Sequence, residues 1–311
     1  MRIATWNING VKARLDGLTR WLEESAPDVV CLQEIKSLDE TFPGEAVERL
    51  GYNVATHGQK GFTGVALLSK RPLEDVTCRL PGDDGDEHAR FIEATVSTDT
   101  GAVRIASLYL PNGNPIDTEK FPYKLAWMDR LIAHAEGLLA NDEPVVLAGD
   151  YNVIPEPADA RHPDRWVDDA LFQPESRQRY RALVNLGYCD ALRAVDASDG
   201  VYTFWDYQAG AWQKNNGIRI DHVMLSPVAA DRLEAVSIEK HTRAWAKPSD
   251  HVPVVVTLDL CSLARIWKIF AITASYLDGR LSHMPTGEER RRPRTAALDL
   301  PHKGDATCSR P

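Results

Sequence analysis

Six short apolar runs, spread over about 250 residues, each carry an acidic, amide or histidine side chain at one end. Short runs rich in β-branched residues predict buried strands, and a polar residue at the end of such a strand lies at the rim of its sheet. Strands placed side by side would gather these groups in one pocket, which suits a hard divalent cation and acid–base chemistry on a phosphate. The six runs are residues 2–7, 29–34, 104–109, 145–152, 219–222 and 249–251.

Helical stretches alternate with these runs over residues 1–260, and this alternation predicts an α/β fold without internal repeats. In the longest stretch, Met128, Leu131 and Ala135 recur at helical spacing. Helices are expected at residues 15–24, 44–50, 122–139 and 176–186. Further strands are expected at residues 61–69, at 90–96 and 102–110 around a turn at 99–101, and at 250–260.

Charge and cysteine content limit the classes of function. The net charge of −9 argues against a non-specific nucleic-acid binder, although a local basic face stays compatible with it. The 5 cysteines are scattered and form no CxxC pair, which indicates reduced thiols. No signal peptide precedes the first strand and no apolar stretch approaches ~18 residues, so we expect a cytoplasmic protein without a membrane segment.

Two acidic positions are candidates for cation binding and proton transfer. Glu34 follows a buried run, and a carboxylate there is a natural Mg²⁺ ligand, although a surface acid is the alternative. Asp150 and Asn152 are two residues apart, so in an extended chain both side chains would point to the same face. One could accept a proton from water while the other donates to a phosphate; a simple turn is the alternative.

His251 opens the last expected strand and is the side chain that titrates near neutrality. Its neighbour Asp250 would point the other way in a strand, so another carboxylate must orient the imidazole. Asp221 is the candidate. A structural histidine is the alternative.

In their order along the chain, the motifs resemble those of the exonuclease III family, the abasic-site endonucleases within the endonuclease/exonuclease/phosphatase superfamily. The resemblance covers about residues 1–260. WN, QE, GDxN and SDH are typical of the whole superfamily, whereas WNINGVKAR, HGQKG, TFWDY and RID narrow it to the exonuclease III type. The superfamily motifs WN, QE, GDxN and SDH begin at residues 6, 33, 149 and 249, respectively. The motifs WNINGVKAR, HGQKG, TFWDY and RID begin at residues 6, 57, 203 and 219.

Residue roles follow from this resemblance. Glu34 would be the principal metal ligand, and the wider ligand set would include Asn7, Asp150, Asn152, Asp250 and His251. Asp150 would align or deprotonate the attacking water, and Asn152 would bond the water or the phosphate. His251, oriented by Asp221, would contact phosphate oxygens, and Tyr109 would donate to the phosphate or act as a phenolate. The substrate-binding residues would be Arg90 and Asn112 for phosphates, and Phe204, Trp205, Ile218 and Ile220 around a baseless sugar.

The resemblance also implies a fold and a reaction. The fold would be a four-layered α/β (α+β) sandwich of two mixed sheets flanked by helices, with the active site at one edge. The protein would be a monomeric, Mg²⁺-dependent nuclease in which Mn²⁺ substitutes, acting on double-stranded DNA with abasic sites or blocked 3′ ends. Alternatives are a non-specific nuclease, an inositol or lipid phosphatase of the same fold, and an inactive DNA-binding protein.

DNA contacts and the C-terminal segment complete these expectations. Residues 1–260 would form the catalytic domain, and 261–311 a partly disordered extension with a short helix at 261–277. The extension carries 9 Lys and Arg against 5 Asp and Glu, which leaves −13 on residues 1–260. Its arginine-rich segment would be a solvated tail, a phosphate-binding arm or a segment without a role. Candidate DNA contacts are Lys12, Arg14, Lys36, Lys60, Arg90, Lys120, Lys124, Lys214, Arg219 and Lys247.

Overall fold

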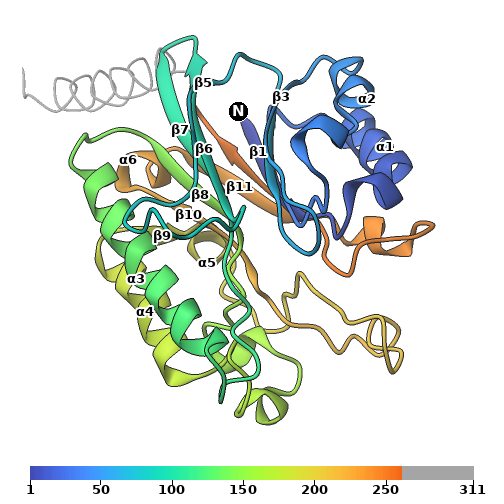
Figure 1. Ribbon diagram of the computed structural model, residues 1–311, viewed down its shortest axis with the longest axis vertical. Helices are drawn as coiled ribbons and strands as arrows, with labels where there is room; N and C mark the ends of the chain where they lie inside the picture. The colour runs from blue at the N-terminus through green and yellow to red at the C-terminus, as the bar shows by residue number, and fades with distance from the viewer. Residues whose placement is uncertain (261–311) are drawn as a thin grey trace, which may run out of the picture. The chain divides into compact units, whose positions relative to one another are not determined.

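Two six-stranded mixed sheets pack face to face in the computed structural model, which describes residues 1–260 (Figure 1). The first sheet has the order β11–β12–β1–β2–β4–β3, and within it β1 and β2 run parallel. Its strands are β1 (Arg2–Asn7), β2 (Val29–Gln33), β3 (Asn53–His57), β4 (Val65–Ser69), β11 (Leu233–Ile238) and β12 (Val254–Leu258). The predicted extension at 261–311, with its helix and arginine-rich segment, lies outside the described residues.

The second sheet has the order β5–β6–β7–β8–β10–β9, and within it β7 and β8 run parallel. The hairpin predicted around residues 99–101 is confirmed, because β6 and β7 pair from Phe91 to Thr98. The strands of this sheet are β5 (Glu74–Cys78), β6 (Phe91–Thr98), β7 (Gly101–Tyr109), β8 (Val145–Asp150), β9 (Cys189–Asp190) and β10 (Asp221–Leu225).

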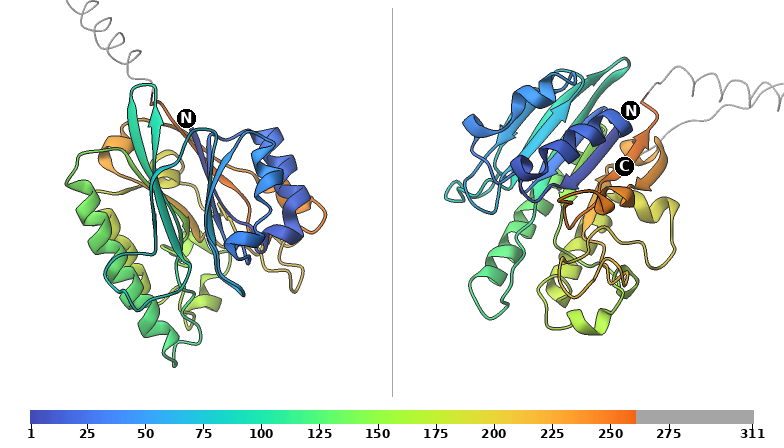
Figure 2. Two further views of the ribbon diagram at one scale, coloured as in Figure 1. Left: turned by 45° about the horizontal axis from the view of Figure 1, so that its top comes forward. Right: turned by 90° about the vertical axis from the view of Figure 1, so that its right-hand side faces the viewer.

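Helices cover the outer face of each sheet (Figure 2). On the first sheet, α1 buries Leu18, Trp21 and Leu22, which follow the 3.6-residue period of a helix, against the strands. On the second sheet, α3 and α4 pack Trp127 and Tyr180 against the strands. The helices are α1 (Leu15–Ser25), α2 (Gly44–Glu48), α3 (Lys120–Leu139), α4 (Pro174–Asn185), α5 (Ala191–Val195) and α6 (Pro227–Ala230), with 3₁₀ turns η1 (Val11–Arg14), η2 (Asp39–Thr41), η3 (Pro157–Asp159), η4 (Pro163–Trp166) and η5 (Lys240–Ala244).

The core between the sheets is built by alternate residues of the strands. In β1, Ile3 faces the second sheet, whereas Ala4 and Trp6 face the helices. This period of two is the strand rule, and both faces are apolar because both are covered. The predicted four-layered α/β sandwich is therefore confirmed. Among residues 1–260, no helix combines the length and apolarity that crossing a membrane requires.

Strand direction brings the polar strand ends to one edge of the sandwich. β1 and β2 run parallel, so Asn7 and the residue after Gln33 lie at the same edge of the first sheet. In the second sheet, Tyr109 pairs with Asp150 at the ends of parallel strands, and Asp221 pairs with Asp150 because β10 runs antiparallel to β8. The last strand begins at Val254, later than predicted, and His251 makes only an isolated bridge with Phe204.

Gly149 allows the close pairing of β7 and β8 one residue before Asp150. A Cβ at this position would lie 1.9 Å from the Leu108 carbonyl oxygen, so the backbone would have to shift. We expect Gly149→Ala to lower the free energy of unfolding by about 3 kcal/mol, the scale of an overpacked core. Urea unfolding midpoints measure the effect.

Gly137→Ala is the matched control. Gly137 lies in α3, where no atom of the described residues is within 4 Å of an added Cβ. This substitution should raise stability slightly, because alanine favours a helix more than glycine does. Equal midpoints for the Gly149 and Gly137 variants would show that the close approach of Gly149 to the Leu108 carbonyl does not affect stability.

Candidate active site

The side-chain amide of Asn7 joins the two sheets at the polar edge. Its Nδ2 donates to Glu34 Oε1 and to Asp150 Oδ2, each at 2.9 Å. Its Oδ1 accepts the backbone N–H of Asn9 at 3.0 Å, which fixes the orientation of the fully buried amide. The Ser249 hydroxyl, in turn, donates to the Asn7 carbonyl oxygen at 2.7 Å. Carboxylates from two different sheets are thereby held on one amide group.

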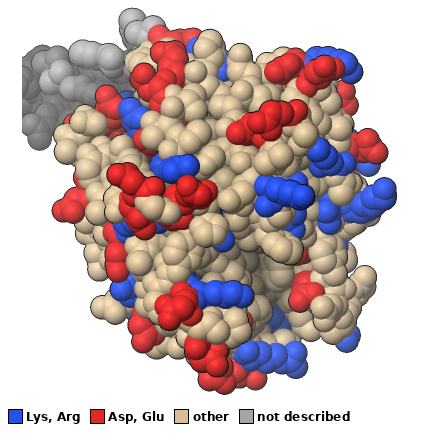
Figure 3. Space-filling view, in the orientation of Figure 1, with Lys and Arg blue, Asp and Glu red and all other residues tan. Residues whose placement is uncertain are grey.

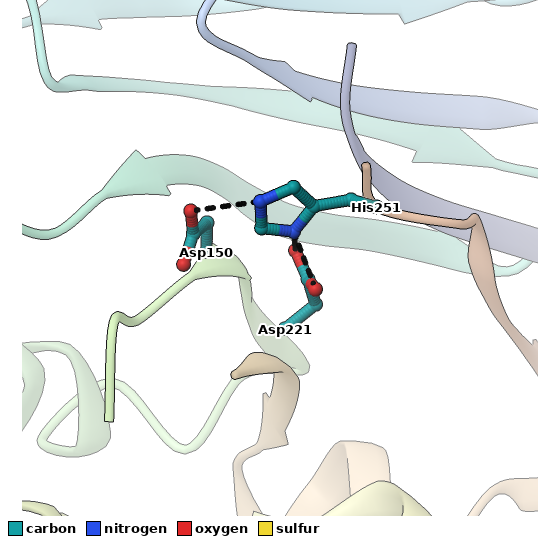
Figure 4. Close-up of side chains that lie close together, drawn as sticks. All are labelled: Asp150, Asp221 and His251. Atoms are coloured by element: carbon teal, nitrogen blue, oxygen red, sulfur yellow. Dashed lines mark hydrogen bonds and ion pairs between the residues drawn. The ribbon is translucent and has the colours of Figure 1, made fainter. Parts of the chain in front are cut away.

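His251 lies between two buried carboxylates (Figure 4). Its Nδ1 is 2.8 Å from Asp221 Oδ2, and its Nε2 is 3.8 Å from Asp150 Oδ2. The Phe204 ring packs against the imidazole with 4.9 Å between ring centroids. Asp250 points elsewhere, and its Oδ1 accepts from Asn9 Nδ2 at 2.9 Å. The imidazole is therefore oriented by Asp221 rather than by its sequence neighbour.

Burial and neighbouring charges shift the acid–base groups of this cluster. Burial lowers the pKa of His251, but Asp221 and Asp150 outweigh it and raise that pKa to about 10. Burial raises the pKa of Asp150 to about 7, opposed by His251 and supported by Asp221. Burial, Glu34 and Asp150 all raise the pKa of Tyr109 well above its ordinary value. At neutral pH the cluster thus holds an imidazolium, a phenol and a carboxyl group poised to exchange a proton.

Glu34 is a carboxylate of the cluster whose pKa is lowered, in contrast to that of Asp150. Burial alone would raise its pKa, but hydrogen bonds from Asn7 and Lys36 lower it below the ordinary value. Lys36 Nζ lies 2.9 Å from Glu34 Oε2 and donates to Asn9 Oδ1 at 2.6 Å. The Glu34 side chain is 16% exposed, so it is the member of the Asn7-linked pair that reaches solvent.

Asn152 does not share an extended strand face with Asp150, and that expectation is wrong. The backbone turns left-handed at Asn152, with a φ of 46°, and its N–H donates to Asp150 Oδ1 at 2.9 Å. The Asn152 amide donates to the Leu110 carbonyl at 2.9 Å and accepts from Asn112 at 3.2 Å. Glu34 and Asn9 also have positive φ angles, of 49° each. Such strained backbone often clusters at functional sites, and the sequence pattern does not reveal it.

An apolar cluster adjoins His251 through Phe204. Phe204 pairs with both His251 and Ile218 in isolated bridges, and it packs beside Ile218, Ile220 and Leu171. Trp205 does not belong to this cluster. It is fully buried in a separate group with Tyr202 and Val252, and its Nε1 donates to Asn215.

Arg90 and Asn112 contact Tyr109 and Asn152, respectively. The Arg90 guanidinium covers the Tyr109 ring at 4.9 Å, and its Nη1 donates to the Tyr109 carbonyl at 3.3 Å. Its Nε is buried and, among the described residues, has no hydrogen-bond partner. Asn112 is exposed and donates to Asn152 at 3.2 Å. Arg90 is itself partly exposed and lines one cavity together with Asn112, so both side chains can meet an incoming anion.

Lys124 and Arg219 are not DNA contacts, and that expectation is wrong because both are buried. Lys124 Nζ donates to the carbonyl oxygens of Asn112 at 3.1 Å and Asn152 at 2.6 Å, so it fixes the loops that carry them. A signal existed in the sequence, because Lys124 occupies the same helical stripe as Met128 and Leu131. Arg219 is 1% exposed and is held by carboxylates within the fold. The other candidates are exposed or partly exposed: Lys12, Arg14, Lys36, Lys60, Arg90, Lys120, Lys214 and Lys247.

Three polar residues that the sequence reasoning missed support the catalytic side chains. Asn9 links Asp250 to Lys36, and the Ser249 hydroxyl accepts the His251 N–H at 3.2 Å. The Thr203 hydroxyl accepts the N–H of Asp221 at 3.2 Å at the start of β10. All three lie inside the recognised motifs, so proximity to a motif was the available signal.

Comparison with known proteins places the chain in a family. Residues 4–251 match the Endonuclease/Exonuclease/phosphatase family, and the chain belongs to this family. Exodeoxyribonuclease III of Haemophilus influenzae is 36% identical over 262 residues, which cover 82% of this chain and 98% of that protein.

Solved structures show the same similarity. An AP endonuclease from Archaeoglobus fulgidus superposes with a TM-score of 0.79 at 35% identity, covering 84% of this chain and 100% of that one. A 3′ phosphatase from Neisseria, bound to a product DNA hairpin, superposes with a TM-score of 0.79 at 35% identity, covering 83% and 99%.

Removing the charge of Asp221 should release the proton of His251. In the metal-free protein we expect His251 to titrate near pH 10, and Asp221→Asn to move its pKa toward the ordinary 6.5. NMR titration of the imidazole resonances measures both values. Asp75→Asn, at an exposed position of β5, is the control and should leave the His251 titration unchanged.

The same substitution should change the pH dependence of stability. Folded His251 keeps its proton up to about pH 10, whereas an unfolded histidine loses it near 6.5, so its contribution to stability declines between these values. We expect the wild type to lose more stability than Asp221→Asn across this window. Identical profiles for the two proteins would contradict the assigned imidazolium–carboxylate pair.

Proposed function

We propose that this protein is a metal-dependent DNA-repair nuclease of the exonuclease III type. It hydrolyses the phosphodiester 5′ to abasic sites and removes nucleotides and phosphates from 3′ ends. The observation that carries the proposal is the Asn7 amide, which holds Glu34 and Asp150 together beside the His251–Asp221 pair. The names of its relatives support it: an exodeoxyribonuclease III, an AP endonuclease and a 3′ phosphatase.

The donor set around Asn7 fits a hard divalent cation, which we take to be Mg²⁺ with Mn²⁺ as a substitute. Carboxylate and amide oxygens suit such an ion. Asp150, Asp221 and His251 also offer ligand atoms within 4.8 Å of one another, but Asp221 is engaged with His251. Glu34 is therefore our principal ligand, with Asn7 and Asp150 beside it and with Asn152 and Asp250 in the wider set. His251 belongs to this wider set only in its neutral form, because an imidazolium has no lone pair for a cation. A bound cation supplies charge neutralisation at the phosphate in the transition state.

Asp150 is our candidate for aligning and deprotonating the attacking water. Its pKa of about 7 lies near the pH at which a general base works best. One N–H of the Asn152 amide is bonded to Leu110, so the second N–H can orient this water or the phosphate. Water attack on phosphorus would then place negative charge on the phosphate oxygens.

His251 and Tyr109 are our candidates for stabilising that charge. The imidazolium, paired with Asp221 through Nδ1, can donate its Nε2–H to a phosphate oxygen. The raised pKa of Tyr109 favours the role of hydroxyl donor over that of phenolate. Arg90, with its unpartnered Nε, and the exposed amide of Asn112 would contact phosphates as well.

The apolar cluster beside His251 supports selectivity for a baseless sugar. Phe204, Ile218 and Ile220 would form a slot that admits a deoxyribose, and Trp205 would support it from behind. A baseless nucleotide is already unstacked, so its extrusion from the duplex costs less than that of a normal nucleotide. Recognition would otherwise read the DNA backbone. We take the working form to be a cytoplasmic monomer.

Asp150→Asn should abolish turnover while largely preserving DNA binding. We expect incision of a duplex with one tetrahydrofuran site, in Mg²⁺, to fall by more than about 10³-fold, because the substitution removes the proton acceptor. Asp75→Asn, exposed on β5, is the control for the change of charge. Near-native turnover by Asp150→Asn would refute its role, and wild-type activity in EDTA would refute the need for a metal.

Truncation after Leu260 should leave incision intact. The family match ends at residue 251, and the proposed catalytic groups all precede it or end there. We therefore propose that residues 1–260 are the catalytic domain. A truncated protein that folds, as its unfolding midpoint reports, yet loses most incision activity would assign a role to residues 261–311.

A further inference from the structure

A cavity of about 300 Å³ adjoins the apolar slot beyond Ile218. A chain of pairings gives its direction from the catalytic cluster: His251 pairs with Phe204, Phe204 with Ile218, and Ile218 with Ala160. The cavity is lined on this far side by Arg161, Arg165, Trp166 and Asp169. It thus lies one step further from His251 than the sugar slot does.

Two cationic side chains of this cavity have no ion-pair partner within residues 1–260. Arg161 and Arg165 are exposed, and no carboxylate of residues 1–260 forms a salt bridge with either. By contrast, Arg177, Arg179 and Arg193 are each paired with a carboxylate. These two guanidinium groups are therefore free to bind an anion.

The cavity is lined by one acid, Asp169, against two arginines, and one oxygen of this acid is hydrogen-bonded. Asp169 accepts from Asn114 Nδ2 at 3.0 Å and from the Leu171 N–H at 2.9 Å. His162, which also lines the cavity, is partly exposed and adds no negative charge. The cavity is therefore cationic in sum.

Backbone hydrogen bonds fix these arginines relative to the slot. The Arg161 N–H donates to the Gly217 carbonyl at 3.0 Å, next to Ile218. The Arg165 N–H donates to the His162 carbonyl at 3.1 Å in η4. Arg161 thus begins from backbone tied to the segment that forms the slot, and Arg165 follows it in the η4 turn. Figure 3 shows a hollow in the lower half of one face, with Lys and Arg as well as Asp and Glu around it.

We propose that Arg161 and Arg165 bind the phosphate attached to the 3′ oxygen of the sugar in the slot. The inference rests on the proposed function: the scissile phosphate, on the 5′ oxygen, lies at His251 and Asp150, and the sugar lies at Phe204 and Ile218. The next phosphate along the strand then falls beyond Ile218, where two free guanidinium groups match it in charge and hydrogen-bond geometry.

This subsite distinguishes internal abasic sites from 3′ ends. An abasic site within a strand carries a phosphate on its 3′ oxygen, whereas a terminal nucleotide carries a hydroxyl there. The arginines therefore contribute to endonuclease action and not to the removal of terminal nucleotides. They would favour incision within a strand over digestion from its end.

Three duplexes test the subsite with the full-length protein in Mg²⁺. The first has an internal tetrahydrofuran site, the second has a neutral methylphosphonate directly 3′ to that site, and the third ends at the tetrahydrofuran with a 3′-hydroxyl. For the wild type, we expect kcat/KM on the second and third to be roughly tenfold lower than on the first, mostly through KM. This comparison needs no variant.

Arg161→Gln and Arg165→Gln then locate the effect in the protein. Each should lower kcat/KM on the first duplex roughly tenfold, and on the other two by less than about twofold. Arg49→Gln is the control, because it removes the same charge from an exposed position just after α2, on the outside of the sandwich. It should leave all three rates unchanged.

Equal losses on all three duplexes, or a methylphosphonate penalty as large in the variants as in the wild type, would overturn the subsite. So would a wild type that cuts the first two duplexes equally well. A wild type that cuts none of them in Mg²⁺ would contradict the proposed nuclease function instead. Unfolding midpoints of the variants show whether a loss of rate reflects folding.

Discussion

One buried amide, that of Asn7, holds together the group of residues on which the proposed chemistry depends. It donates at 2.9 Å to Glu34, which follows a strand of the first sheet, and to Asp150 of the second sheet. It thereby couples the two sheets at the polar edge, beyond the apolar core that lies between them. Burial, with the neighbouring Asp221 carboxylate, raises the pKa of Asp150 to about 7, although His251 opposes the shift. A cation held by the oxygens of Glu34 and Asp150 would favour their ionised forms, and the pair is for that reason suited to binding one.

A second buried charge network stabilises the strand that carries Asp221. Arg219 lies two residues before it, with its Nε 2.6 Å from Asp159 and its Nη1 2.7 Å from Asp190. Burial raises the pKa of both carboxyls, but Arg219 outweighs it and holds them low, so they stay ionised. Breaking such a pair leaves a buried charge without a partner, which is costly, and the network therefore specifies one position for this segment. The free arginines near the slot differ from Arg219 because they face solvent, and a local cationic rim of this kind is how a chain of net charge −9 can meet DNA.

The sequence predicted the elements better than it predicted the orientation of side chains. Apolar runs and helical periodicity predicted the layers, because both faces of each sheet are buried, and the end of each run placed Glu34, Asp150 and Asp221 at one edge. The sequence did not predict the left-handed backbone at Glu34 and Asn152, because that conformation depends on the surrounding contacts and not on strand spacing. Positive charge alone wrongly predicted that Lys124 and Arg219 contact DNA. Lys124 instead donates to backbone carbonyls inside the fold, and Arg219 pairs with buried carboxylates. Arg161 and Arg165 gave no motif signal, and their proposed role depends on the tertiary structure that places both with Ile218 around one cavity.

The most direct measurement of the central claim is a double-mutant cycle on Mg²⁺ affinity. Calorimetric titration of the wild type, Glu34→Gln, Asp150→Asn and the double variant at neutral pH compares the two carboxylates joined by Asn7. If they form one centre, each single change weakens binding roughly tenfold or more, and the double variant loses clearly less than the product of the two effects. Affinities that multiply independently, or that neither substitution alters, would contradict a shared cation site at Asn7.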